Sequence, residues 1–409
     1  MKDTYDILIL GGGAAGFFTA INTAEVNPEL TIAILERGKE VLTKVKVSGG
    51  GRCNVTHAEF IPKDLSTNYP RGEKELIGPF HSFMTGDTIA WFEERGVALK
   101  IEEDGRMFPV TDSSQTIIDC FVNETKRLGI EVLQGQSVKQ ILKTDGGFEL
   151  VTPSEVFSAK KVVIATGSNP KVWKILEALG HTIVPPVPSL FTFNIKDERI
   201  ADLPGLATEV SVEVLSENGS VLLASEGPLL ITHWGMSGPA ILKLSAWGAR
   251  LLEPTKYHFT IRVNWLHYLS AEDAMEQLLE LKLQNPKQTL QKYAQFDLPK
   301  RLWQRLLNAS EITVIQTWAD VSKKELLRLS EALTQSTFKV EGKSTFKEEF
   351  VTAGGVQLKE VNFKTFESKV IPDLYFAGEV LNIDAITGGF NFQNAWTGGY
   401  LVAQSLAKP

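Results

Sequence analysis

Apolar and polar positions follow two different periods along the chain, and the changes of period divide the sequence into segments. An unbroken apolar run at 5–10 enters a glycine cluster, and a second run at 31–35 ends on an acidic residue. Short apolar runs bounded by glycines are typical of buried parallel strands, and residues 17–24 between them favour a helix. The start of the chain therefore predicts a βαβ unit.

Alternating strands and helices continue to about residue 190. We expect helices near 88–94 and 114–128, and strands at 97–101, 130–133, 138–142 and 148–151. Residues 161–165 form another apolar run, which ends in Thr166-Gly167. Because open α/β sheets bind ligands at the carboxyl ends of their strands, this second glycine turn belongs to the predicted binding edge.

The pattern changes at Pro185-Pro186-Val187-Pro188, which suits a crossing between domains. Alternating apolar residues and the hairpin signal Asn218-Gly219 then predict a mainly antiparallel β segment at 191–265, and helical spacing predicts a mainly helical segment at 266–335. From about residue 346 a strand, a glycine turn and a last helix are able to rejoin the first sheet. The prediction is an α/β protein with a discontinuous Rossmann-like nucleotide-binding domain, 1–190 and 345–409, and an inserted β domain with a helical subdomain, 191–344.

Composition narrows the class of protein. The 409 residues are 43% hydrophobic and 22% charged with a formal net charge of -7, which predicts a globular chain and argues against wholesale nucleic-acid binding. Neither a cleavable leader nor a membrane-spanning apolar stretch is evident, so the cytoplasm is the expected location and no membrane partner is expected. The two cysteines, Cys53 and Cys120, do not form a C-x-x-C pair, which argues against a dithiol relay.

The first glycine cluster has the spacing of a dinucleotide-binding turn. In Gly11-Gly12-Gly13-Ala14-Ala15-Gly16, the first glycine allows the tight turn, Gly13 lets the backbone approach a pyrophosphate, and Gly16 lets the helix pack on the sheet. Glu36, which ends the second strand, suits a ribose hydroxyl, whereas Arg37 suits a 2′-phosphate that Glu36 would repel. We favour FAD or NAD over a phosphorylated nucleotide; the alternative is a glycine turn in another kind of α/β protein.

Further segments favour FAD over NAD. Ser48-Gly49-Gly50-Gly51-Arg52-Cys53-Asn54 offers adjacent backbone donors and one fixed charge, which suits a pyrophosphate or the edge of a flavin. Gly378-Glu379 and Asp384 suit ribityl hydroxyls, although Asp384 could instead cap a helix. The segment Gly388-Gly389-Phe390-Asn391 opens a helix whose N-terminus would stabilise negative charge on a reduced flavin.

Several motifs, in order along almost the full length, resemble the bacterial BaiN/RdsA family of NAD(P)- and FAD-dependent oxidoreductases, also described as aminoacetone-oxidase-like flavoproteins. They are the N-terminal fingerprint, Lys44 with Ser48–Asn54, Gly105–Pro109, Gly180–Pro185, Thr232–Pro239, Val351–Val356 and Ala377–Asn391. The resemblance implies an FAD domain in two parts, interrupted by a β domain with a helical subdomain. Three features depart from the family: Ser168-Asn169-Pro170 replaces a glycine-rich loop, Asn382 replaces a common Asp, and Phe390 a common Tyr.

The resemblance also implies roles for individual positions. Those expected along FAD are Ala15, Glu36, Arg37, Lys44, Arg52, Asn54, the Val138 backbone at the adenine, Thr166, Gly167, Gly378, Glu379, Asp384, Gly389, Phe390 and Asn391. Ala14, Ser48, Gly51 and Cys53 belong to the same predicted cofactor segments.

His233 is the candidate for chemistry, because an imidazole exchanges protons near neutral pH and lies here in a loop rich in small residues. The alternative is a histidine that only hydrogen-bonds its loop, and Arg106 either binds an anionic substrate or secures its own loop. No metal-ligand spacing occurs.

The sequence predicts an FAD-dependent oxidoreductase that transfers a hydride between flavin N5 and a small organic molecule. A second nucleotide fingerprint is absent, so NAD(P)H would dock transiently, or oxygen or a protein would reoxidise the flavin. A flavin-dependent enzyme that modifies nucleic acid, and a flavin sensor without turnover, are the alternatives.

Overall fold

The computed structural model describes residues 4–344 and 351–407, and the chain forms two compact units. The first unit joins residues 1–187 to residues 347–409, and the second is residues 188–346. The sequence placed these divisions after residue 190 and before residue 345; the second falls at the edge of residues 345–350, outside the described part. The predicted fold class, α/β with a Rossmann-like domain, is confirmed.

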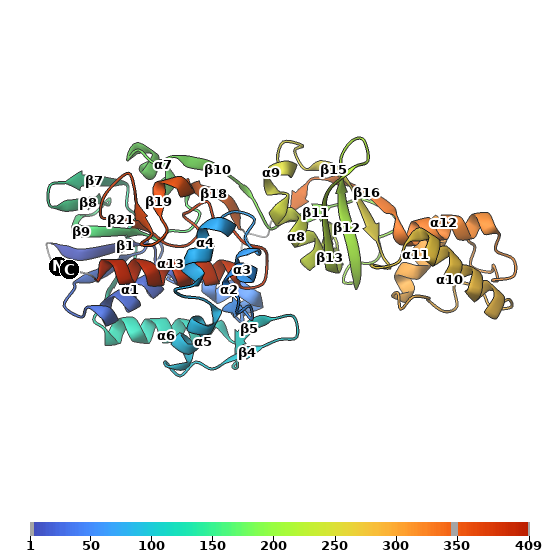
Figure 1. Ribbon diagram of the computed structural model, residues 1–409, viewed down its shortest axis with the longest axis horizontal. Helices are drawn as coiled ribbons and strands as arrows, with labels where there is room; N and C mark the ends of the chain where they lie inside the picture. The colour runs from blue at the N-terminus through green and yellow to red at the C-terminus, as the bar shows by residue number, and fades with distance from the viewer. Residues whose placement is uncertain (1–3, 345–350, 408–409) are drawn as a thin grey trace. The chain divides into compact units, whose positions relative to one another are not determined.

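A mixed sheet with a parallel core forms the centre of the first unit (Figure 1). Its parallel strands have the order β6-β2-β1-β9-β21, and β7 and β8 form an antiparallel hairpin against the start of β9. The strands are β1 Tyr5–Leu10, β2 Ile32–Leu35, β6 Glu131–Leu133, β7 Gln140–Thr144, β8 Gly147–Val151, β9 Val156–Ile164 and β21 Leu374–Phe376, with β19 Val361–Asn362 and β20 Glu367–Ser368 beyond β21. The strands predicted in these regions are confirmed.

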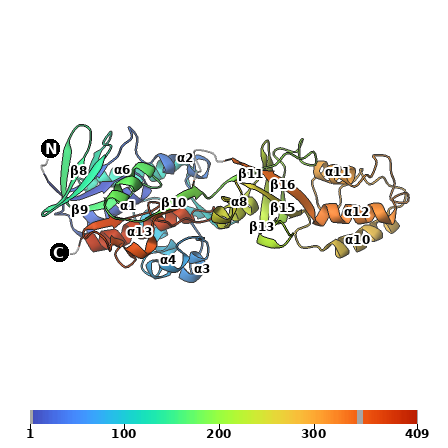
Figure 2. The same cartoon turned by 90° about the horizontal axis from the view of Figure 1, so that it is seen from above.

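Two helices from opposite ends of the chain, α1 Ala14–Val26 and α13 Phe390–Leu406, lie side by side (Figures 1 and 2). Gly399 permits their close contact, because a Cβ there would lie 3.0 Å from Thr19 Oγ1. The other helices of this unit are α2 Thr43–Gly51, α3 Pro62–Ser66, α4 Glu73–Phe80, α5 Thr85–Glu93, α6 Ser114–Arg127, α7 Pro170–Ala178 and the 3₁₀ turn η1 Leu358–Glu360. The sequence predicted α5 and α6 but treated the segment after Glu36 as a glycine-rich loop; the helices α2 to α4 are too short to show a clear period.

Two small sheets complete the first unit. One consists of β3 Thr56–His57, β4 Leu99–Ile101 and β5 Arg106–Pro109, and the other pairs β10 Ile183–Pro188 with β18 Thr352–Val356. The proline-rich crossing is therefore itself a strand, which the sequence did not predict. A strand that pairs on one side only tolerates prolines, because their missing N–H groups leave the other edge unaffected.

The second unit contains an antiparallel sheet of order β16-β15-β12-β13-β14-β11-β17. The strands are β11 Thr192–Asn194, β12 Ala207–Leu215, β13 Val221–Thr232, β14 Gly235–Ser237, β15 His258–Asn264, β16 Ser336–Glu341 and β17 Lys343–Ser344; the helices are α8 Pro239–Trp247, α9 Ala249–Leu252, α10 Ala271–Gln284, α11 Lys300–Ala309 and α12 Lys323–Thr334. Sheet and helices share one hydrophobic core, which includes Val212, Trp303 and Leu329. No helix within 4–344 or 351–407 is long and apolar enough to cross a membrane.

Candidate functional site

The strand order places two glycine turns next to each other. Strand order reverses between β1 and β9, whose last residues Leu10 and Ile164 are paired in register. The turn after β1 has Gly11 at φ 112°, where a Cβ would collide with the carbonyl oxygen of Ala165 after β9. A Cβ at Gly16 would in turn collide with the Gly11 carbonyl oxygen. Both glycines are required by close backbone packing at the crevice where such sheets bind ligands.

Gly13 has a different environment from these two glycines. No heavy atom of the part of the chain that the structure describes lies within 4 Å of a Cβ built at Gly13, so the space at this position of the turn is open. Gly13 is also the N-cap of α1, and the first turn of this helix has neither a side-chain cap nor an acidic residue. The first backbone N–H groups of this helix, including those of Ala14 and Ala15, have no acceptor within the helix, and the positive end of the helix dipole lies at the same place.

Glu36 directly follows β2 and lies beside this turn. Its Oε2 accepts a hydrogen bond from the Gly12 N–H at 2.8 Å, and its Oε1 accepts one from the Gly38 N–H at 2.7 Å. These two bonds fix the carboxylate at the crevice. An ionised carboxylate has about four acceptor positions, so it can still accept hydrogen bonds from ligand hydroxyls.

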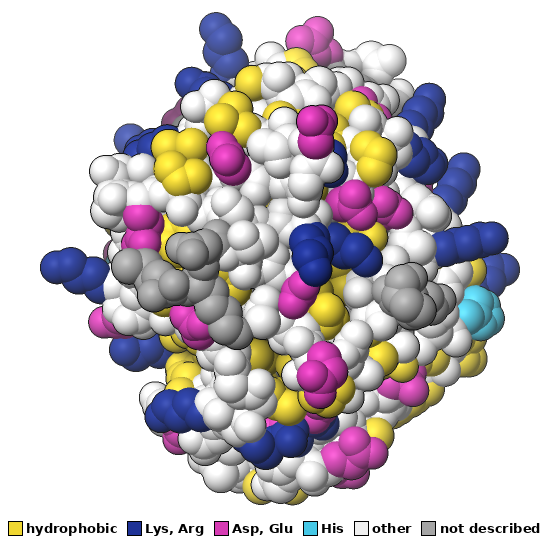
Figure 3. All heavy atoms as spheres, turned by 90° about the vertical axis from the view of Figure 1, so that its left-hand side faces the viewer, with side chains coloured by type: hydrophobic (Ala, Val, Ile, Leu, Met, Phe, Trp, Pro, Cys, Tyr) yellow, Lys and Arg dark blue, Asp and Glu magenta, His cyan; other side chains and the backbone are white. Residues whose placement is uncertain are grey.

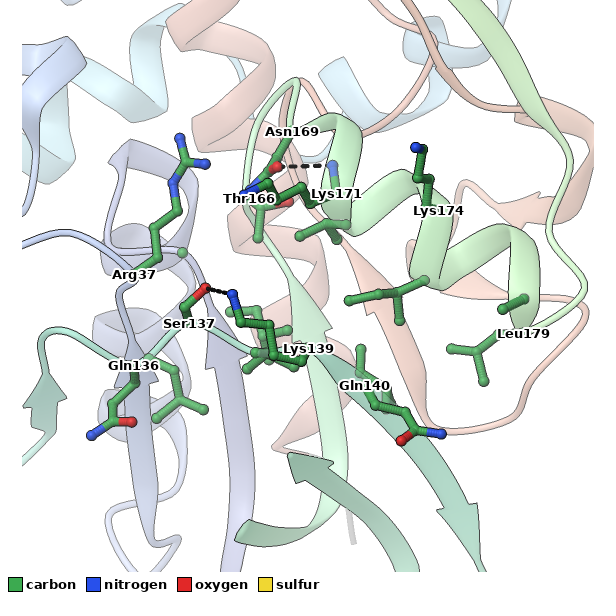
Figure 4. Close-up of a pocket in the computed structure, with 18 of the residues that line it drawn as sticks. Arg37, Gln136, Ser137, Lys139, Gln140, Thr166, Asn169, Lys171, Lys174 and Leu179 are labelled. Carbon is green, nitrogen blue, oxygen red and sulfur yellow. Dashed lines mark hydrogen bonds between the residues drawn. The ribbon is translucent and has the colours of Figure 1, made fainter. Parts of the chain in front are cut away.

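A cavity of about 570 Å³ continues from Glu36 along the carboxyl edge of the sheet (Figure 4). Val138 and Thr166 line it, and basic side chains of Arg37, Lys139, Lys171 and Lys174 also contribute to its lining. The Thr166 hydroxyl is buried and has no hydrogen-bond partner within residues 4–344 and 351–407. A buried polar group without a partner is costly, and here it lines the cavity, so it marks a place for a polar ligand.

Segments far apart in sequence meet on the other side of the turn. Lys44 Nζ lies 2.7 Å from Glu379 Oε2, and a Cβ at Gly167 would lie 3.7 Å from the same oxygen. Gly378 packs on the first turn of α1, where a Cβ at Gly378 would lie 3.1 Å from the Ala15 Cβ. The structure thus brings together four of the predicted cofactor segments: the first glycine turn, the segment of Lys44, the turn at Gly167 and the segment of Gly378-Glu379.

The loop of Ser48 to Asn54 lies at the end of α2, where Gly49 and Gly50 have φ of 56° and 69°. The Cys53 N–H donates to the Ser48 carbonyl oxygen at 3.0 Å, and burial raises the pKa of the Cys53 thiol to about 12, so this thiol remains protonated near neutral pH. The Arg52 guanidinium pairs with Glu102 at 2.5 Å. It also stacks on Phe108 at 3.8 Å. The predicted contact of its charge with a cofactor therefore stays a prediction, because the side chain is engaged within the protein.

Two further predicted side chains are also engaged within the protein. The Asp384 carboxylate is completely buried and forms an ion pair with Arg71. Asn391 accepts from the Ala385 N–H at 3.0 Å and donates to the Ala385 carbonyl oxygen at 3.2 Å. The alternative that Asp384 caps a helix is wrong, since the N-cap of α13 is Gly389.

The start of α13 closes this end of the site. Gly389 has φ 97°, and a Cβ there would lie 2.5 Å from the Thr56 carbonyl oxygen and 2.9 Å from Asn54 Oδ1. Phe390 is buried, and its carbonyl oxygen accepts from the Tyr69 hydroxyl at 2.6 Å. The loop and the helix start therefore pack directly on each other, and the N-terminus of α13 has no side-chain cap.

His233 belongs to the second unit, on the turn between β13 and β14. Its side chain is exposed, and its catalytic role stays a prediction. Ser237 nearby accepts a hydrogen bond from the Thr192 hydroxyl at 3.1 Å, an arrangement without an activating base. Among the described residues, no three His, Cys, Asp or Glu side chains gather as a metal site.

Sequence reasoning did not find His57, Arg71 or the unpartnered Thr166 hydroxyl as features of the site. Arg71 and Asp384 are 313 positions apart, so no local pattern links them. For His57 there was one signal, its position directly after the predicted cofactor loop.

The fold and the open glycine turn define a dinucleotide-binding α/β protein of the flavoenzyme type. The family model described as HI0933-like protein Rossmann domain matches residues 5–405, and the chain belongs to this family of flavoprotein oxidoreductases. The resemblance inferred from the sequence motifs is thereby confirmed.

Relatives of known name cover the whole chain. The chain is 30% identical to the "Ribosomal RNA dihydrouridine synthase" of Escherichia coli over 99% of this chain and 98% of that protein. It is 28% identical to the "3-dehydro-bile acid delta(4,6)-reductase" of Clostridium scindens over 98% of both chains. The fold is similar to that of the 3-ketosteroid delta1-dehydrogenase of Sterolibacterium denitrificans, with a TM-score of 0.52 at 10% identity over 99% of this chain and 100% of that one.

Proposed function

We propose that this protein binds FAD and transfers a hydride between flavin N5 and an organic substrate. The observation that carries the proposal is the open nucleotide turn, in which α1 starts at Gly13 without a cap, without an acidic residue and with free space in front of it. An uncapped helix start of this kind binds anions through its N–H groups and its dipole. A pyrophosphate fits there with no side chain in its way.

The residues around the turn would hold the remaining parts of the cofactor. Glu36 would accept from ribose hydroxyls, and the Val138 backbone would meet the adenine. The Thr166 hydroxyl would gain a polar partner that it otherwise lacks. At the other end, the uncapped N-terminus of α13 would face the flavin ring and favour its negatively charged reduced state.

We further propose that the substrate contains a ring double bond conjugated to a carbonyl group. Bound FAD supplies a hydride carrier for such a double bond. Support comes from the names of the relatives, since a dihydrouridine synthase and a 3-dehydro-bile acid delta(4,6)-reductase both saturate double bonds of this kind. Saturation also requires a proton on the neighbouring carbon, and we propose His233, whose side chain is exposed, as the donor.

Uridine in ribosomal RNA is the second candidate substrate. Two relatives with this name, from Escherichia coli and Haemophilus influenzae, match 99% and 100% of this chain at 30% and 28% identity. The net charge of -7 weighs against it, as does the mixture of acidic and basic side chains on the face shown in Figure 3. A small molecule that contains such a ring, rather than ribosomal RNA, therefore remains the first proposal.

The test begins with the purified protein, with and without added FAD. We expect yellow protein with stoichiometric flavin, reduced in stopped-flow mixing by NADH or NADPH and reoxidised by conjugated cyclic enones. Reoxidation by oxygen alone would make oxygen the second redox partner, and dihydrouridine formed in added ribosomal RNA would favour the second candidate. Colourless protein that fails to bind FAD would contradict the proposal. In a protein that does turn over, His233→Ala should slow reoxidation with FAD still bound.

A further inference from the structure

Three successive residues, Val55 and the two residues of β3, form hydrogen bonds to the first half of α13 and to the segment just before it. The Val55 carbonyl oxygen accepts from Trp396 Nε1 at 2.9 Å, and the Thr56 hydroxyl donates to Gln393 Oε1 at 2.6 Å. His57 follows, with Nδ1 3.0 Å from the Gly388 carbonyl oxygen. The first two hydrogen bonds are buried, whereas the His57 side chain is half-buried.

The hydrogen bond fixes the protonation of the His57 ring. Burial lowers the pKa of His57, although the bond to Gly388 and the charges of Asp104 and Glu59 act against this shift, so the ring is neutral at pH 7 with a single proton. A carbonyl oxygen can only accept, so that proton must be on Nδ1. The His57 Nδ1–H therefore donates to Gly388.

The same ring fills the space that two glycines leave free. Gly388 has φ 131°, and a Cβ there would lie 3.2 Å from His57 Nδ1 and 2.8 Å from the Phe390 ring. The His57 ring stacks on Phe390 with centroids 4.5 Å apart and planes at 27°. Gly105 packs against the other ring nitrogen, where a Cβ would lie 2.5 Å from Nε2. The imidazole is thus held on both sides.

We propose that His57 is a positioning residue for the flavin end of the site. By holding the Gly388 carbonyl and the Phe390 ring, it sets the direction of the N–H groups that begin α13. The inference rests on the proposed binding of FAD, whose ring those N–H groups would face. No covalent step is assigned to His57.

The test compares four variants of the full chain. In His57→Asn the amide nitrogen takes the place of Nδ1 and keeps the donor; in His57→Gln the amide lies at the place of Nε2; His57→Leu has no donor. His258→Leu is the matched control, because Nδ1 of His258 also lies 2.9 Å from a backbone carbonyl, that of Lys256, but in the second unit. The readouts are the FAD dissociation constant of the apoprotein, the visible flavin spectrum, and the melting temperature of the apoprotein.

We expect His57→Leu and His57→Gln to weaken FAD binding about tenfold, the effect of losing about one hydrogen bond, and to shift the flavin bands. His57→Asn and His258→Leu should resemble the wild type. Wild-type spectra and affinity in both His57→Leu and His57→Gln would overturn the inference. So would a lower melting temperature with unchanged flavin bands, which indicates a structural role alone, or an Asn variant as impaired as the Leu variant. Wild-type protein that binds no FAD would instead refute the proposed function.

Discussion

The two ends of the candidate site differ in how their side chains are used. At the end proposed for the adenosine, Arg37 has no carboxylate partner and the Thr166 hydroxyl has no hydrogen-bond partner among the described residues, and both residues line the cavity. At the end proposed for the flavin, the side chains of Arg52, Asp384 and Asn391 are bound to other parts of the protein. The side chains of the first end are available to a ligand, whereas those of the second end form hydrogen bonds and ion pairs within the protein.

This difference separates two effects of substitution. Where the side chains form the wall, the backbone N–H groups and the helix dipole remain to meet the ligand, so a change of side chain should act on folding first. Where side chains are unpartnered, a change should act on cofactor affinity and leave folding unchanged. The predictions that follow test this separation.

The largest effect is expected at Asp384. Its carboxylate is fully buried and Arg71 is 14% exposed, and removal of one partner of a buried ion pair leaves an uncompensated charge. Asp384→Asn should lower the free energy of unfolding by about 3 kcal/mol in urea titration of the apoprotein. The control is Asp373→Asn, since Asp373 is 43% exposed beside Lys143 and should cost under about 1 kcal/mol. Normal stability together with lost FAD binding would show that Asp384 contacts the ligand, and the proposed difference between the two ends would be wrong.

The next largest effect is expected at Gly13, where the backbone is extended and the space is open. Gly13→Ala should fold as the wild type does, because its Cβ meets no protein atom. The same Cβ would occupy the place of the pyrophosphate, so FAD affinity should fall by about 100-fold, or about 3 kcal/mol. Gly86→Ala is the control, since a Cβ at Gly86 also meets nothing within 4 Å but lies in α5. Unchanged affinity in Gly13→Ala would show that the phosphates bind elsewhere.

The sequence predicted the parts of the site that depend on the backbone. The roles of Gly11 and Gly16 follow from spacing after an apolar strand, and the structure gives each of them a backbone oxygen that leaves no room for a Cβ. The sequence also predicts a first domain in two parts, because a terminal strand and helix without partners of their own need a sheet to join.

The side chains of the flavin end were harder to predict. Asp384 pairs with Arg71, and Arg52 with Glu102, across long stretches of sequence that only folding brings together. The sequence of a motif does not distinguish a carboxylate or guanidinium that binds a ligand from one that pairs with another residue of the chain. Backbone roles are local in sequence, whereas the partners of charged side chains are not.

The smallest effect is expected at Thr166, and it tests the adenosine end directly. Thr166→Val keeps the shape and removes a buried hydroxyl without a partner, so the free energy of unfolding of the apoprotein should stay the same or rise by about 1 kcal/mol. FAD affinity should fall about fivefold, because the ligand would lose one hydrogen bond. Thr85→Val is the matched control: its hydroxyl is also buried and unpartnered, but it lies in α5 and not among the residues that line the cavity. If both variants gain stability and only Thr166→Val loses affinity, the hydroxyl is held for a ligand. Equal changes of stability and of FAD affinity in the two variants would mean that the Thr166 hydroxyl, like that of Thr85, has no role in binding. The difference between the two ends would then rest on the cavity alone.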